Sequence, residues 1–174
     1  YFNRKSDGRA FAEWYSIDPP FPTGIFGDEK LKPGVYVNGG IMPLVGGELA
    51  RAAFRYGYPE YGIDILRRYF RMIDSTGEAY LWYFPDGSPA TKEASTSPEA
   101  YPTDGWGSSA MLAALIQGLA GVRSGRPGFG AARIEPRWKH AGVTEAEVTL
   151  SHPSSRKELH YNYLYDPEER KTEI

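Results

Sequence analysis

The sequence predicts a mainly α-helical domain that is followed by a small antiparallel β cap. Residues 44–56 and 59–76 place apolar side chains three and four positions apart, which is typical of helices that bury one face. Residues 106–121 are apolar on every side and predict a third helix, one that other structure encloses. Near the C-terminus the apolar period changes to two, which predicts β-strands.

The first 43 residues show no helical period. Proline and glycine interrupt them at Asp18-Pro19-Pro20, at Lys32-Pro33-Gly34 and at Asn38-Gly39-Gly40. Such punctuation predicts an extended segment rich in loops.

Proline and glycine residues predict where the first two helices begin and end. The first helix runs from Leu44 to Tyr56, and Gly57 is able to close its end. The second starts at Pro59, a residue favoured at the first helical position, and Gly77 ends it. Its apolar stripe consists of Ile63, Leu66, Phe70 and Ile73. Both helices should therefore cover a core with one face.

Residues 78–105 form a long irregular stretch before the third helix. It contains the strong turn signal Phe84-Pro85-Asp86-Gly87-Ser88-Pro89. A loop of this length in a compact domain usually carries function. We therefore look for functional residues here first.

The third helix needs more neighbours than two helices can supply. We expect its segment Ala110–Ala120 either to face a partner or to leave a large apolar surface exposed. The missing neighbours would belong to the remainder of a longer chain or to another chain.

The C-terminal region predicts a hairpin. Ala146, Val148 and Leu150 alternate with polar residues before a turn at Ser154-Ser155-Arg156. A second alternating run follows, and a short strand is expected before the hairpin at Ala132–Glu135. The second run is Leu159, Tyr161, Tyr163 and Tyr165.

Composition excludes several classes of partner. The net charge of −2 and the pI near 6 supply no basic stripe for nucleic acid. The longest apolar stretch, Ala110–Val122, is too short to cross a bilayer. The chain has no cysteine, and its three histidines show no metal-ligand spacing. We expect no metal, no cofactor, no nucleic acid and no membrane, and the localisation stays open.

Several blocks of residues together resemble a known family. The blocks are Tyr36-Val37-Asn38-Gly39-Gly40-Ile41-Met42-Pro43, the helix pair after it, Tyr80-Leu81-Trp82-Tyr83-Phe84-Pro85-Asp86-Gly87, and Gly105-Trp106-Gly107-Ser108-Ser109-Ala110 leading to Gly118-Leu119-Ala120-Gly121-Val122. In this order, between Pro20 and Trp138, they resemble the last third of the six-hairpin glycosidases. These are the (α/α)6-barrel glycoside hydrolases, which include glucosidase, trehalase, debranching-enzyme and rhamnosidase-like groups.

The resemblance implies both a fold and a reaction. Residues 1–130 would be the C-terminal portion of an (α/α)6 toroid, and residues 131–174 would be its β-rich cap. The reaction would be inverting hydrolysis of a glycoside, in which one carboxyl group protonates the leaving oxygen and another activates water. The acid would lie in an earlier helix pair, outside this chain. Where the family commonly has the basic glutamate, this chain has Leu81, which cannot accept a proton.

Glu99 and Asp104 are the candidate catalytic carboxylates. They lie in the loop just before Trp106, flanked by rings that could exclude water and raise a carboxyl pKa. The alternative is structural: Asp104 would cap the third helix and Glu99 would be a solvated loop charge. The other carboxylates in the same loop system are Glu78, Asp86 and Glu93.

Aromatic side chains are the candidate saccharide contacts, because their rings stack on the C–H faces of a pyranose. They are Trp82, Tyr83, Phe84 and Trp106. Asn38 could add an amide that binds sugar hydroxyls. The alternatives are core packing for the rings and a turn that requires positive φ for Asn38-Gly39-Gly40.

Three functions therefore stay open. The chain could be part of a glycoside hydrolase, a non-catalytic carbohydrate-binding piece that holds an oligosaccharide, or a structural fragment. Leu81 favours the second, because a binding piece needs no general base.

Overall fold

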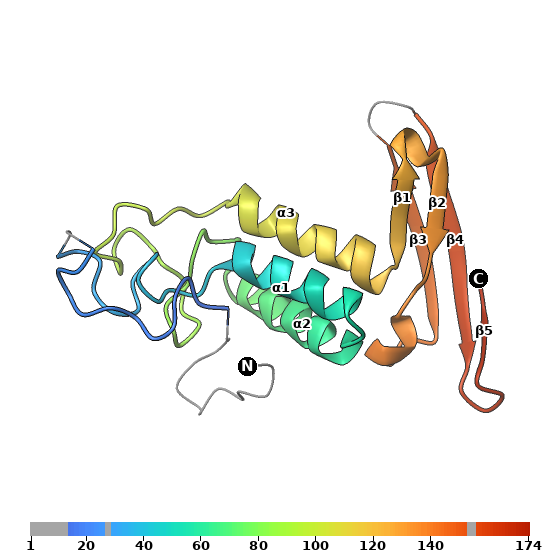
Figure 1. Ribbon diagram of the computed structural model, residues 1–174, viewed down its shortest axis with the longest axis horizontal. Helices are drawn as coiled ribbons and strands as arrows, with labels where there is room; N and C mark the ends of the chain where they lie inside the picture. Colours follow the sequence, from blue (N-terminus) through green and yellow to red (C-terminus); the bar gives the residue numbers. More distant parts are fainter. Residues whose placement is uncertain (1–13, 27–28, 153–155) are drawn as a thin grey trace.

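The computed structural model describes residues 14–26, 29–152 and 156–174. Within them lie three α-helices, α1 (Pro43–Arg55), α2 (Pro59–Thr76) and α3 (Gly105–Ala114), and α3 continues into one π-helical turn, η1 (Leu115–Leu119). Two antiparallel sheets follow, β1 (Val122–Arg126) with β2 (Ala131–Ile134), and β3 (Glu145–Ser151) with β4 (Glu158–Asp166) and β5 (Lys171–Glu173). Short 3-10 turns occupy Pro127–Phe129 (η2) and Trp138–Ala141 (η3). Figure 1 shows irregular loops at one end of an elongated molecule, the helices in the middle and the sheets at the other end.

The prediction of a mainly α toroid is wrong for this chain. Of the described residues, 34% are helical and 22% lie in strands. Residues 14–26 and 29–42 before α1, and residues 77–104 before α3, form no helix, because proline and glycine interrupt them repeatedly. The region from Val122 to Glu173 pairs instead as two sheets. The chain is a small mixed α/β domain.

The closest helix contact joins α1 to α3. A Cβ atom on Gly47 would stand 2.5 Å from the carbonyl carbon of Ala110, and one on Gly107 would stand 2.5 Å from the Cβ of Pro43. No larger residue fits at either position unless the helices separate. The two helices run in the same direction, so their N-terminal ends lie side by side, and α2 runs the opposite way (Figure 1).

Large side chains fill the space around this contact. Trp14, Ile41, Phe54, Ile65 and Tyr83 are almost completely buried in one cluster. The Phe54 ring lies directly on the backbone of two glycines, one in α2 and one in η1. The core therefore joins the helices to both of the loops that precede α1 and α3.

Helix α3 is not enclosed by the described residues. Leu112 is 54% exposed, and Phe70 on the neighbouring α2 is 67% exposed. Between these helices lies an apolar groove that Met111, Leu115 and Trp138 also line. The third helix therefore leaves apolar surface uncovered, as its all-round apolar sequence predicts.

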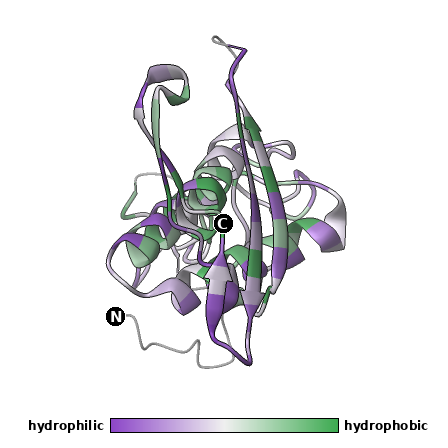
Figure 2. Cartoon of the chain, turned by 90° about the vertical axis from the view of Figure 1, so that its right-hand side faces the viewer, coloured by the Kyte–Doolittle hydropathy of each residue, from purple (hydrophilic) through white to green (hydrophobic). Residues whose placement is uncertain are grey.

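The predicted hairpin is confirmed as β3 and β4, which pair in the register Val148↔Tyr161. Its turn at Ser154-Ser155-Arg156 lies partly outside the described residues. Hydrophobic and hydrophilic bands alternate along these strands in Figure 2, as a sheet with one covered face requires. The Tyr161 hydroxyl donates to the carbonyl of Ala120 at 2.7 Å and fastens the sheet to the end of η1.

The first sheet begins earlier than the proposed division between residues 130 and 131. Strand β1 starts at Val122 and pairs with β2, which overlaps the short strand expected at Ala132–Glu135. The division into a helical part and a β-rich cap stays a prediction.

Replacing Gly47 with alanine tests the α1–α3 contact. We expect Gly47→Ala to lower the free energy of unfolding by about 1–3 kcal/mol, because the new methyl group would overpack the contact with Ala110. Gly105→Ala is the matched control, since it lies in the first turn of α3 and its Cβ would meet nothing within 4 Å. Chemical unfolding of both variants measures the difference. Equal stability of the two would contradict the close packing.

Candidate functional site

Two loops meet at the N-terminal ends of α1 and α3. The backbones of Ile41 and Tyr83 exchange two hydrogen bonds, at 2.8 and 2.9 Å. The N–H of Asp104 donates to the carbonyl of Ala79 at 2.8 Å, which fixes the start of α3 against the same loop. Figure 1 shows these segments gathered on the left of the helices. We call this region the loop end.

Asn38 is buried within the N-terminal loop, and its side chain hydrogen-bonds to backbone groups of the same loop. Its side-chain oxygen accepts from the N–H of Phe21 at 2.8 Å, and its amide donates to the carbonyls of Phe21 and Leu31 at 2.9 and 2.8 Å. Gly39, with φ of +99°, makes the turn behind it. Both amide N–H donors are in use, so neither remains for a sugar hydroxyl.

Trp82 and Tyr83 lie in the core. Both have no exposed surface, and the Trp82 indole donates to the carbonyl of Glu99 at 2.6 Å. The Tyr83 hydroxyl accepts from the N–H of Tyr80 at 3.1 Å. Phe84 is half-buried and packs edge-on against the Trp82 ring at 4.8 Å between centroids. Trp82 and Tyr83 therefore present no ring face to a ligand at the surface.

Asp104 caps α3. Its two carboxylate oxygens accept from the N–H groups of Trp106 and Gly107 at 3.1 and 2.7 Å. A negative charge is stabilised there, because the N-terminal end of a helix carries a partial positive charge. The two hydrogen bonds hold the carboxylate in place, and because Asp104 is only half-buried it still reaches the surface.

Glu99 has a fixed backbone and an exposed side chain. Its carbonyl accepts from Trp82, and its N–H donates to the Ser97 hydroxyl at 3.2 Å. The side chain is exposed to solvent. Its carboxylate can therefore accept a proton or a hydrogen bond from a ligand.

Tyr36 lies at the loop end, with its ring against that of Trp82 at 6.2 Å between centroids. It is half-buried, and its pKa is raised by burial first and then by the negative charges of Glu99 and Asp104. Its φ of +45° is a left-handed conformation that a tyrosine rarely adopts, and such strain often occurs at functional sites. Thr103, next to Asp104, also has positive φ, at +60°. The sequence does not indicate this role for Tyr36, because nothing in its neighbours predicts positive φ at a tyrosine.

Trp106 is the most exposed of the aromatic rings that the structure describes at the loop end; Phe21, Phe26 and Tyr101 are exposed by 41–47%. It occupies the first turn of α3, two residues after Asp104, and is 69% exposed. Tryptophan is usually among the more buried residues of a folded chain. We define the loop-end site as Tyr36, Glu99, Asp104 and Trp106.

The charge of Asp104 also reaches the buried phenols beneath it. Burial, and to a lesser degree this charge, raise the pKa of Tyr69, whose hydroxyl lies 3.1 Å from that of Ser108. Burial above all raises the pKa of Tyr83 to about 12, with smaller contributions from Tyr69, Tyr80 and Asp104. These phenols therefore stay neutral at physiological pH.

The Tyr83 phenol makes stability fall at alkaline pH. Tyrosine titrates near 10 in the unfolded chain and at about 12 here, so between these pH values the folded chain binds more protons. The contribution is fully present below pH 10 and is lost as the pH rises to 12. We expect the wild type to lose about 2–3 kcal/mol more than Tyr83→Phe over this range. Denaturant unfolding at a series of pH values between 10 and 12 measures the free energy of unfolding of both proteins. An equal loss of stability in the two would contradict the raised pKa of Tyr83.

Two variants separate the stabilising effect of the Asp104 hydrogen bonds from that of its negative charge. Asp104→Ala should lower the free energy of unfolding by about 1 kcal/mol, because the N–H groups of Trp106 and Gly107 lose their acceptor. Asp104→Asn keeps an acceptor oxygen and should cost less. Thermal unfolding of the two variants gives the comparison. If asparagine cost as much as alanine, charge rather than capping would be the stabilising property.

The described residues carry few other features that point to chemistry. They hold no group of three or more His, Cys, Asp or Glu side chains that could bind a metal. In the same residues, no helix is both long and apolar enough to span a membrane.

Comparison of the chain with protein-family models, with curated proteins and with solved structures finds no match. The resemblance to six-hairpin glycosidases is thus carried only by the residues quoted for it and stays a prediction. The loop-end site must be interpreted from its own geometry.

Proposed function

We propose that the loop end is one wall of a saccharide-binding site in a glycoside hydrolase. Trp106 would stack on a sugar ring, and the Tyr36 hydroxyl and the two carboxylates would bind sugar hydroxyls. The observation that carries the proposal is the exposure of Trp106 in the first turn of α3, directly after the capping carboxylate of Asp104. An indole packs well on the C–H face of a pyranose.

Within this proposal Glu99 is the general base that activates water. Its carboxylate is exposed and its backbone is held, whereas the Asp104 oxygens already accept two helix N–H groups. Asp104 would instead orient the substrate and the Tyr36 hydroxyl. An inverting reaction needs its acid about 6.5–9.5 Å from the base, and we place that acid on a structure outside this chain. That structure, a further part of the protein or another chain, would be the second partner besides the oligosaccharide.

Binding without hydrolysis is the second candidate. Leu81 stands where the resembling family commonly has its base, and it cannot accept a proton. In this case Trp106 and Tyr36 would still hold the saccharide, and Glu99 would only accept hydrogen bonds from it. The two candidates share one site and differ in the role of a single carboxylate.

Saccharide affinity tests the role of Trp106. We expect Trp106→Ala to weaken binding of an oligosaccharide about tenfold or more, because the stacking platform is lost. Tyr56→Ala is the matched control: this ring is 72% exposed at the far end of α1 and should not change the affinity. Calorimetric titration with a panel of gluco-oligosaccharides measures both. Equal affinity of the two variants would contradict the site.

Glu99→Gln separates the two candidates. A hydrolase in its complete assembly should lose turnover and keep its saccharide affinity, because glutamine fills the same space and cannot act as a base. Unchanged turnover would remove Glu99 as the base. A wild type that binds the saccharide without any turnover would support binding as the function. Release of reducing sugar measures turnover, and the titration above measures binding.

A further inference from the structure

Arginines gather at the opposite end of the helices from the loop-end site. There α1 and η1 end, β1 begins, and the side chains enclose a cavity of about 340 Å³. It is lined by Glu48, Arg51, Ala52, Arg55, Tyr56, Gln117, Gly118 and Arg123. Three guanidinium groups and one carboxylate thus surround one small space.

The cationic groups of this cavity have few partners. Glu48 is bound to the Arg51 Nη1 at 2.7 and 2.9 Å, so its charge is already used. Among the described residues, the buried Nε of Arg51 has no hydrogen-bond partner, and the Arg55 guanidinium makes no hydrogen bond or ion pair. Arg123 has one long contact, 3.5 Å from its Nε to the carbonyl of Gln117. The cavity therefore holds an excess of unpaired positive charge.

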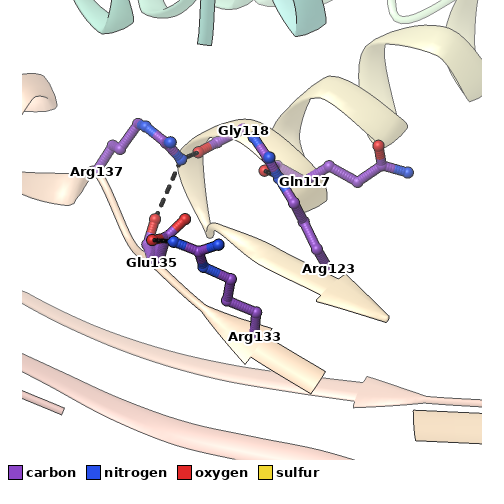
Figure 3. Close-up of polar contacts among 6 residues, drawn as sticks. All are labelled: Gln117, Gly118, Arg123, Arg133, Glu135 and Arg137. Atoms are coloured by element: carbon purple, nitrogen blue, oxygen red, sulfur yellow. Dashed lines mark hydrogen bonds and ion pairs between the residues drawn. The ribbon is translucent and has the colours of Figure 1, made fainter. Parts of the chain in front are cut away.

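Stabilisation of helix ends explains only part of this cluster. Cations often lie at helix C-terminal ends, where they bind unpaired carbonyls. Here Arg137 already donates to the carbonyl of Gly118 at 2.9 Å, and its backbone N–H donates to that of Leu119. Figure 3 shows Arg137 reaching Gly118 from one side, with the Arg123 side chain on the other side of the turn. The carbonyls of Gly118 and Leu119 thus already have donors, and Arg123 makes only its long contact with the carbonyl of Gln117.

The arginines also repel one another. Burial lowers the pKa of Arg137, and the positive charge of Arg123 lowers it further. The negative charge of Glu135 partly offsets this lowering of the Arg137 pKa, but Glu135 also pairs with Arg133 on β2, as Figure 3 shows. Arg123 also lines the cavity, so an anion bound there would reduce the positive potential that Arg123 imposes on Arg137.

We propose that this cavity binds a phosphate-type oxyanion, either inorganic phosphate or the phosphate group of a monoester. A guanidinium fork matches two phosphate oxygens at once. Arg51 and Arg55 line the cavity from α1, and Arg123 lines it from β1. Gln117 and Tyr56 add polar groups at the rim. The site is independent of the saccharide site, because it lies at the other ends of the same helices.

Calorimetric titration of the whole chain with inorganic phosphate tests the proposal, with chloride at matched ionic strength as the reference. We expect saturable binding that Arg123→Gln and Arg55→Gln each weaken about tenfold or more, as the loss of a charge-assisted hydrogen bond requires. Arg126→Gln is the control, since Arg126 is exposed on the same strand as Arg123 and does not line the cavity. It should bind phosphate like the wild type.

The result that would overturn the proposal is an absence of binding beyond the chloride reference, or equal affinity in all three variants. Arg55 is exposed, so its variant should fold even if Arg123→Gln does not. Glycerol phosphate distinguishes the two sources of the oxyanion. Tighter binding than inorganic phosphate supports a phosphomonoester, and weaker or equal binding supports inorganic phosphate.

Discussion

The close contact between α1 and α3 determines where everything else in this chain can lie. Glycine at positions 47 and 107 lets the two helices touch backbone to backbone, with their N-terminal ends side by side. The loop before each helix is thereby brought to one end of the molecule, where Ile41 and Tyr83 join them. Without that contact, the N-terminal ends of α1 and α3 would not be held side by side.

The parallel arrangement also gives the two ends of the helical layer opposite chemistry. Asp104 and Glu99 lie near the helix N-terminal ends, and Arg55 and Arg123 lie near the C-terminal ends. Each charge sits where the partial charge of the helix end favours it. Within the part of the chain that the structure describes, some of these charged groups have no counter-charge at either end. We therefore interpret each end as a place for a polar ligand: hydroxyl groups at the first, an oxyanion at the second.

The sequence predicts the regular elements well and the irregular ones poorly. Periodicity locates α1, α2 and the β3–β4 hairpin to within a few residues, because each buries one face. The toroid, which the family resemblance implies, is wrong, since the described residues form three helices and two antiparallel sheets. Strand β1 was not foreseen, because its residues after Val122 are polar and show no alternation. In the loops, nothing distinguishes the buried Trp82 from the exposed Trp106, since only contacts distant in sequence decide which ring is covered.

The indole N–H signals of the chain's tryptophans give the most direct test of the saccharide site. Trp14 and Trp82 are buried, Trp138 donates to the Tyr161 hydroxyl, and Trp106 is exposed at the loop end. Titration with an oligosaccharide, followed by nitrogen-15 NMR, should shift the Trp106 signal and leave that of Trp138 in place. A saturating saccharide that leaves Trp106 unchanged, or that shifts only Trp138, would contradict the account.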